Sequence, residues 1–169
     1  MGHDSDLILI LGMNGAGKTT LAKTIVKDKP VIWVDIEFIW QLSEVISLNY
    51  KETFEIFTKK LYLRLEKNPP KSPVYVVFDD VDEFEPMYSE GLHSLIIRER
   101  HLNINLIIIS RRPRFLPKIA ELNAEKIYVF HLHPDDAEYI KRAYNPDFQN
   151  PSEKYKYVEI RNIMGDKSG

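Results

Sequence analysis

The chain has 169 residues, of which 44 % are hydrophobic and 28 % charged, and its formal net charge is −2. This length suffices for one domain with a hydrophobic core, and the composition excludes an intrinsically disordered chain. The absence of cysteine excludes disulfides, thiolate metal sites and cysteine nucleophiles. Residues 1–6 lack a signal-peptide pattern and no apolar run reaches the roughly 18 residues of a membrane span, so we expect a soluble cytoplasmic protein without a membrane partner.

Apolar runs rich in β-branched residues alternate with segments of helical periodicity. In chain order, we expect a strand at 7–11, a helix at 19–28, a strand at 31–35, helices at 38–48 and from 50 onward, a strand at 74–78, a helix ending near 100, a strand at 106–110, a short helix within 113–122, a strand at 126–130, a helix from 134, and an edge strand at 155–160 before a frayed tail at 165–169. Trp33 and Trp40 lie in apolar periodic segments and are expected in the core.

This alternation predicts an α/β fold, with a mainly parallel sheet between two layers of helices. We interpret residues 1–169 as a single domain, with a core at about 6–144 and a C-terminal extension at 145–169. In such sheets ligands bind at the carboxyl ends of the strands, so the informative residues should directly follow strands.

The segment from Gly12 to Thr19 reads Gly-Met-Asn-Gly-Ala-Gly-Lys-Thr. It matches the P-loop pattern G-x-x-x-x-G-K-[ST] in the required context, after a buried strand and before a helix. Its backbone N–H groups and the helix N-terminus would bind the phosphates of ATP. Lys18 would reach the β- and γ-phosphates, and the Thr19 hydroxyl would bind Mg²⁺. The predicted nucleotide-binding residues are Gly12, Asn14, Gly15, Ala16, Gly17, Lys18, Thr19 and Thr20.

Asp79 and Asp80 follow the strand at 74–78 and resemble a Walker B pair. Asp79 would hold Mg²⁺ through water, and Asp80 would act as the base toward the attacking water. Many related ATPases have Glu at the second position, and Asp is one methylene shorter, so Glu83 is an alternative contributor. The other interpretation is that both aspartates cap a helix. If the pair acts on water, the protein is an ATP hydrolase.

Residues 98–118 hold six of the 23 basic side chains but one of the 25 acidic ones, which makes this segment locally basic. Ser110 and Arg111 follow a strand and are candidate sensors of the γ-phosphate, the alternative being a solvated basic loop. Arg98 and Arg100 close a predicted helix. Either they cap its C-terminus, or one is an arginine finger for the nucleotide of a neighbouring subunit.

The stretch Arg98–Pro113, with the segments 119–130 and 155–160, resembles the FtsK–HerA superfamily of DNA-pumping ATPases, in particular short viral genome-packaging members. This resemblance implies an additional-strand P-loop fold with a RecA-like core, in which the sensor strand lies between the P-loop and Walker B strands. It further implies a homo-oligomeric ring that threads double-stranded DNA, in the host cytoplasm or associated with the virion. Arg111 replaces the usual sensor glutamine, and Asp80 the usual Walker B glutamate.

Two other function classes remain open at the level of sequence. Residues 78–82 and 109–111 also resemble STAND-type regulatory switch ATPases, although these normally carry further domains. A small-molecule or nucleoside kinase would need an acceptor pocket, which residues 36–66 could supply. The Asp79-Asp80 pair suits the activation of water better than that of an acceptor hydroxyl.

Overall fold

A twisted six-stranded sheet forms the centre of the molecule in the computed structural model, which describes residues 6–161. The strands lie in the order β2-β3-β4-β1-β5-β6. The first five pair in parallel, and β6 is antiparallel to β5. Their bounds are β1 Leu7–Leu11, β2 Val31–Val34, β3 Val74–Phe78, β4 Ile104–Ser110, β5 Lys126–Val129 and β6 Val158–Arg161.

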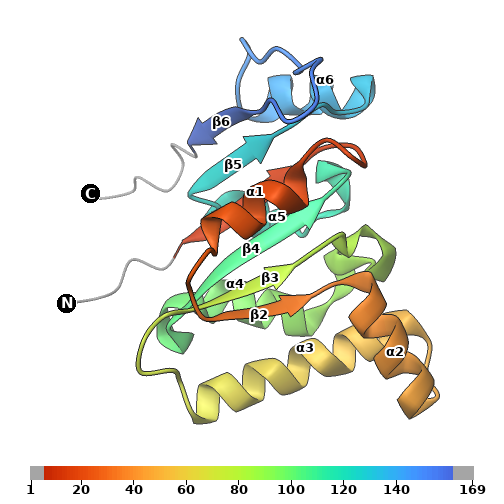
Figure 1. Ribbon diagram of the computed structural model, residues 1–169, viewed down its shortest axis with the longest axis vertical. Helices are drawn as coiled ribbons and strands as arrows, with labels where there is room; N and C mark the ends of the chain where they lie inside the picture. The colour runs from red at the N-terminus through yellow and green to blue at the C-terminus, as the bar shows by residue number, and fades with distance from the viewer. Residues whose placement is uncertain (1–5, 162–169) are drawn as a thin grey trace.

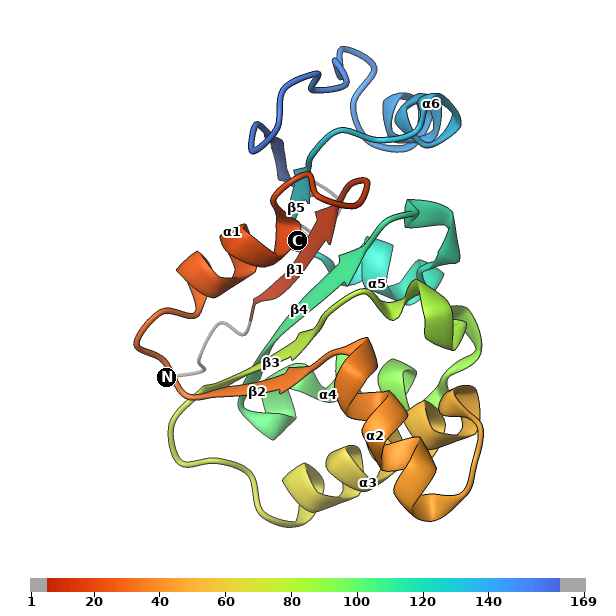
Figure 2. The ribbon, with the colours of Figure 1, turned by 45° about the vertical axis from the view of Figure 1, so that its right-hand side comes forward.

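Helices cover both faces of this sheet, as Figures 1 and 2 show: α1 lies on one face, and α3, α4 and α5 lie on the other. The α-helices are α1 Lys18–Ile25, α2 Ile36–Ile46, α3 Tyr50–Lys67, α4 Glu90–Leu102, α5 Lys118–Asn123 and α6 Pro134–Ala143, and the short 3₁₀ helices are η1 Val81–Phe84, η2 Pro86–Tyr88 and η3 Pro113–Phe115. The predicted three-layer α/β/α fold is therefore confirmed. Among the described residues, no helix has the length and apolar character that crossing a membrane requires.

The core has two parts because side chains of a strand alternate between the faces of the sheet. In β1, Leu7, Leu9 and Leu11 pack into the larger part, beneath α3, α4 and α5. Ile8 and Ile10 pack into the smaller part, beneath α1. All five are at least 96 % buried, which explains why this strand is apolar without interruption.

β4 lies between β1 and β3, which confirms the strand order expected from the resemblance to additional-strand ATPases. This order places the ends of β1, β3 and β4 side by side at one edge of the sheet. The P-loop follows β1, Asp79-Asp80 follow β3, and Ser110 ends β4 with Arg111 directly after it. The fold alone thus gathers the predicted nucleotide site.

Two expectations from the sequence need correction, and a third concerns residues that the structure does not describe. The edge strand begins at Val158 instead of 155, because the Tyr155 N–H donates to the carbonyl of Ala16 and so cannot join the ladder to β5. Trp40 is 54 % exposed on α2 and Trp33 is only partly buried, so the prediction that both belong to the core was wrong for Trp40. The expected tail at 165–169 lies outside the described residues.

Candidate nucleotide-binding and catalytic site

The P-loop is tied to the ends of the two strands beside β1. The N–H of Gly12 donates to the carbonyl of Ser110 at 3.2 Å, and the N–H of Met13 donates to that of His131 at 2.8 Å. A Cβ atom at Gly12 would lie 2.7 Å from the Cβ of Phe130. Only glycine therefore fits at this first position, where the loop leaves the sheet.

Lys18 begins α1 and its side chain is folded back over the loop, 8 % exposed. Its Nζ donates to the carbonyl of Met13 at 3.0 Å. Burial lowers the pKa of Lys18, while the carboxylates of Asp80 and Asp79 oppose that shift. A buried ammonium with one neutral acceptor is poised to exchange this contact for phosphate oxygens.

Asp79 lies directly across from α1. Its Oδ2 accepts a hydrogen bond of 3.1 Å from the Thr19 hydroxyl, and burial raises its pKa although this hydrogen bond lowers it. A hydroxyl and a carboxylate are the hard oxygen donors that Mg²⁺ prefers, and nucleotide sites need few protein ligands because phosphates and waters supply the rest. The predicted pair of metal ligands is thus adjacent and chemically suited to the ion.

Asp80 faces Arg111, which follows β4. The Nε of Arg111 lies 3.1 Å from the Oδ1 of Asp80 and its Nη2 lies 2.5 Å from the Oε1 of Glu83. Burial raises the pKa of Asp80, and Arg111 opposes the shift. Asp80 also has a φ of 58°, a left-handed conformation uncommon outside glycine. The structure therefore brings the candidate base and the candidate sensor into one ion pair.

Asp82 completes this network, although it was not among the site residues predicted from the sequence. Its carboxylate accepts a hydrogen bond of 2.6 Å from the Ser110 hydroxyl and one of 2.7 Å from the N–H of Arg111, and its side chain is 3 % exposed. Asp82 links the loop after β3 to the loop after β4. Two features of the sequence could have indicated this role. Asp82 is the third acid of the run Asp-Asp-Val-Asp that follows β3, and the neighbouring strand β4 ends in Ser110.

Arg98 and Arg100 do not join the site of their own chain. They lie in the last turns of α4, which leads into the start of β4 and so ends at the opposite edge of the sheet. Arg98 pairs with Glu66 at 3.4 Å and Arg100 with Glu125 at 3.9 Å. Any catalytic role for either arginine must therefore act on another copy of the chain.

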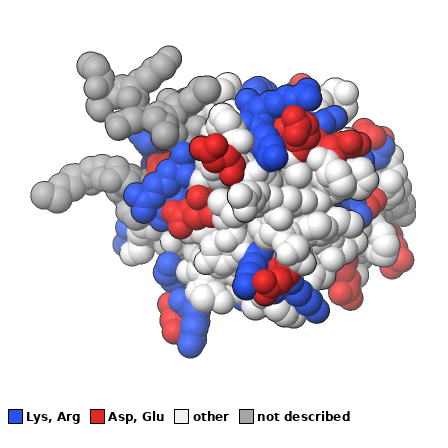
Figure 3. Space-filling model, turned by 90° about the horizontal axis from the view of Figure 1, so that it is seen from above, with Lys and Arg blue, Asp and Glu red and all other residues white. Residues whose placement is uncertain are grey.

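The basic segment is partly neutralised in the fold. Arg112 and Arg114 both approach the buried carboxylate of Asp136, with Nε to oxygen distances of 3.2 and 3.8 Å. On the face that carries β6 and α6, basic and acidic side chains are interspersed (Figure 3). The local excess of positive charge along the sequence thus does not become a uniform basic surface on this face.

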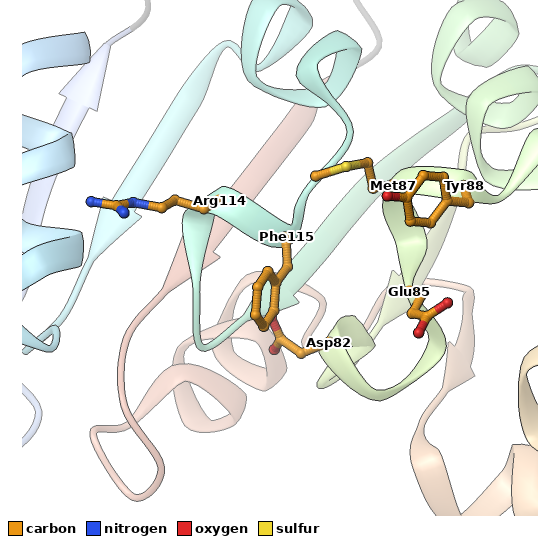
Figure 4. A pocket seen from close by; sticks show the side chains of 6 residues that line it. All are labelled: Asp82, Glu85, Met87, Tyr88, Arg114 and Phe115. Atoms are coloured by element: carbon orange, nitrogen blue, oxygen red, sulfur yellow. The ribbon is translucent and has the colours of Figure 1, made fainter.

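A hollow of about 440 Å³ lies beside Asp82 (Figure 4). Its lining comprises Asp82, Glu85, Met87, Tyr88, Arg114 and Phe115. The Phe115 ring points toward Asp82, whereas Arg114 points away from the other five side chains. Because the one cationic side chain of the lining, Arg114, points away and the other two charged residues are acids, this hollow does not suit a triphosphate.

The P-loop faces a smaller pocket of about 180 Å³, lined by Gly15, Gly17, Lys18, Thr19, Thr20, Lys154 and Tyr155. The first five belong to the predicted nucleotide-binding residues. Lys154 and Tyr155 come from the C-terminal extension, and the sequence analysis did not include them. No motif marks them, because their place at the P-loop depends on how the chain returns after α6.

Comparison with known proteins identifies the family. The family model described as "AAA domain" matches residues 4–140, most of the chain. The chain belongs to this AAA domain family. A search of curated proteins found no match. Together with the complete P-loop, the family makes the chain an ATP-hydrolysing enzyme of the P-loop class.

Solved structures show which folds this AAA domain resembles. The genome packaging NTPase B204 from Sulfolobus turreted icosahedral virus 2, in complex with ATP-gammaS, is 17 % identical with a TM-score of 0.68, covering 92 % of each chain. The ATPases 2 and 3 of EssC from Geobacillus thermodenitrificans are 14 % identical with a TM-score of 0.65, over 95 % of this chain and 38 % of that one. The N-terminal domain of zonular occludens toxin from Neisseria meningitidis is 15 % identical with a TM-score of 0.51, over 73 % of this chain and 75 % of that one.

These identities establish likeness of fold and nothing finer. The P-loop ATPase fold expected from the sequence is thereby confirmed. B204 and EssC share the fold of this AAA domain. In this chain the P-loop follows β1 and Asp79-Asp80 follow β3 of the sheet.

Proposed function

We propose that this protein is a Mg²⁺-dependent ATPase that moves double-stranded DNA, acting as a homo-oligomeric ring in genome packaging. One observation carries the proposal: the P-loop, Asp79-Asp80 and Arg111 meet at one edge of a sheet whose fold extends over 92 % of B204, a genome packaging NTPase. The core at about 6–144 would carry the chemistry, with 145–169 as an extension. The protein would act in the cytoplasm, or in that of the host if it is viral.

In this proposal the P-loop amides bind the triphosphate, and Lys18 exchanges the carbonyl of Met13 for β- and γ-phosphate oxygens. Thr19 and Asp79 are the residues that would hold Mg²⁺, Asp79 through water. Bound there, the ion neutralises charge on the phosphate oxygens. The remaining chemistry belongs to the groups around Asp80.

Asp80 would orient a water molecule and take its proton as the water oxygen bonds to the γ-phosphorus. The bond from that phosphorus to the β–γ bridging oxygen breaks, and ADP leaves with the electron pair. Arg111 would move from Asp80 toward the γ-phosphate, which both stabilises charge there and frees the carboxylate. The ion pair between Asp80 and Arg111 supports this coupling, because the guanidinium already lies against the carboxylate that it would release.

Arg98 and Arg100 enter the proposal through the ring. Both are exposed, at the edge of the sheet opposite the P-loop. In a ring, one of them would reach the nucleotide of the neighbouring subunit as an arginine finger. The rest of the segment 98–118, with exposed Arg114 and Lys118, is the candidate contact for DNA phosphates.

The test is ATP hydrolysis with and without duplex DNA, together with the mass of the assembly. We expect duplex DNA to stimulate hydrolysis, and the stimulation to fall steeply with salt because phosphate contacts release counterions. Lys18→Ala should lower hydrolysis by at least about 100-fold, while Lys23→Ala, on the same helix, should not. DNA-independent phosphorylation of a small acceptor by a monomer would rule the proposal out.

A STAND-type switch is the second candidate, and the network around Arg111 favours it. Three acids, Asp80, Asp82 and Glu83, surround this arginine, and the resemblance to STAND-type ATPases falls on the same two segments, 78–82 and 109–111. Such a switch would turn over slowly, without stimulation by DNA. The same assay therefore separates the two candidates.

A further inference from the structure

The C-terminal extension returns from α6 and crosses the P-loop. Asn150 anchors it: its Oδ1 accepts from the N–H of Leu132 at 2.9 Å, and its Nδ2 donates to the carbonyl of Leu132 at 2.8 Å. Five residues later the N–H of Tyr155 donates to the carbonyl of Ala16 at 2.9 Å. The extension is therefore bonded both to the loop after β5 and to the P-loop itself.

Tyr155 occupies an unusual backbone conformation at this crossing, with a φ of 65°. Left-handed geometry at an aromatic residue has an energetic cost, and strained residues of this kind cluster at active sites, ligand clamps and switch regions. The consequence here is the position of the ring. Its Cδ1 would lie 2.6 Å from a Cβ atom at Gly17, so the ring rests on the glycine of the P-loop.

The Tyr155 ring is nevertheless 57 % exposed and lines the pocket that contains Thr19 and Thr20. The Nζ of Lys154 lies 5.0 Å from the centroid of this ring and lines the same pocket. An aromatic ring and an ammonium thus stand beside the start of α1. They are adjacent to the phosphate-binding amides but are not part of the P-loop motif.

We propose that Tyr155 and Lys154 bind the base-bearing half of the nucleotide. Lys18 directs the β- and γ-phosphates toward Asp79 and Asp80, so the α-phosphate and the nucleoside leave the loop on the side of Thr20, where the extension lies. The Tyr155 ring stacks on the base, and the Lys154 ammonium pairs with the α-phosphate. A stacked ring does not itself distinguish adenine from guanine, since each base has a π-face.

This inference rests on nucleotide binding at the P-loop, and its test separates the two halves of the ligand. The probes are a non-hydrolysable ATP analogue, AMP and inorganic tripolyphosphate, titrated by calorimetry into the full chain. Tyr155→Ala should lower the affinity for the ATP analogue and for AMP by about 10-fold. Its affinity for tripolyphosphate should stay within about 2-fold of the wild-type value. Tyr155→Phe should bind all three as the wild type does.

Matched variants on the same segment are the controls. Tyr157 is similarly exposed, but its ring packs against Tyr128 and Phe130, so Tyr157→Ala should leave all three affinities unchanged. Lys154→Ala should lower the affinity for AMP. Lys156→Ala, which removes an ion pair with Glu153, should leave that affinity unchanged. A thermal unfolding transition verifies that each variant is folded. If Tyr155→Ala is not folded, Tyr155→Leu takes its place in the titrations.

Two results would overturn the proposal. Unchanged affinity of Tyr155→Ala for the ATP analogue would show that the ring does not touch the base. An equal loss for tripolyphosphate would show that Tyr155 only supports the P-loop. If the wild type bound neither tripolyphosphate nor the ATP analogue, the nucleotide site itself would fail, an outcome distinct from both. Failure of DNA to stimulate hydrolysis would refute the motor and leave this inference standing.

Discussion

The Nε atom of Arg111 lies 3.1 Å from the Oδ1 atom of Asp80, and neither atom has a hydrogen-bond partner among residues 6–161. The contact is thus an ion pair without the geometry of a hydrogen bond. Both groups are replacements for the residues usual in related ATPases, a glutamine and a glutamate. A glutamate at position 80 would be one methylene longer and would collide with the guanidinium of Arg111, a group that the usual glutamine does not have. The shorter acid and the arginine therefore fit each other.

Arg111→Ala tests this relationship. We expect kcat for ATP hydrolysis to fall by at least about 100-fold, because a cation at the γ-phosphate contributes that much or more to phosphoryl transfer, while KM changes little. Steady-state kinetics measure both. Arg142→Ala, which removes an exposed pair with Glu138, is the control. A normal kcat in Arg111→Ala would restrict this arginine to holding the loops together.

Asp80→Asn should remove the base and keep the shape of the side chain. We expect kcat to fall by about 10²- to 10⁴-fold, the usual contribution of a positioned base, with ATP-analogue affinity preserved. Asp79→Asn should differ, because it would raise the Mg²⁺ concentration needed for half-maximal activity. If the two variants had the same metal dependence and the same kcat, the separate roles assigned to Asp79 and Asp80 would be wrong.

The sequence predicted most of the fold because β1, β3 and β4 contain long apolar runs and alternate with segments of helical periodicity. Through the resemblance to additional-strand ATPases it also predicted that β4 lies between β1 and β3. It did not predict Asp82 or Tyr155 as parts of the site. Asp82 matters through hydrogen bonds to Ser110 and Arg111, 28 and 29 residues away. Tyr155 belongs to the site because its N–H donates to the carbonyl of Ala16 in the P-loop. Such tertiary contacts leave no periodicity in the sequence.

Arg98→Ala and Arg100→Ala test for an arginine finger. Because both side chains lie far from the site of their own chain, we expect the monomer to bind an ATP analogue as the wild type does. If one is a finger, its variant should lower hydrolysis by about 10³-fold or more in the assembled protein alone. The measurement compares activity in size-separated monomer and assembly. Equal losses in both would indicate a structural role at the end of α4.

Tyr144→Phe tests a buried cluster that joins α5 to the end of α6. The carboxylate of Glu121 accepts hydrogen bonds from Tyr144, from Tyr139 at 2.6 Å and from Lys118 at 2.9 Å. Burial, reinforced by Glu121, raises the pKa of Tyr144 well above its usual value. An unfolded tyrosine ionises near pH 10, so above that pH the unfolded state loses its proton first and the free energy of unfolding falls as pH rises.

Below about pH 10 both states are protonated and the contribution of Tyr144 is fully present. Tyr144→Phe should therefore lower the free energy of unfolding at pH 8 by about 1 kcal/mol, the usual value of one hydrogen bond. Between about pH 10 and 11 the free energy of unfolding should fall less in this variant than in the wild type. Urea unfolding at both pH values measures this. Tyr88→Phe, whose ring is 77 % exposed, should change neither quantity. A decline as steep as in the wild type would show that Tyr144 does not link stability to pH.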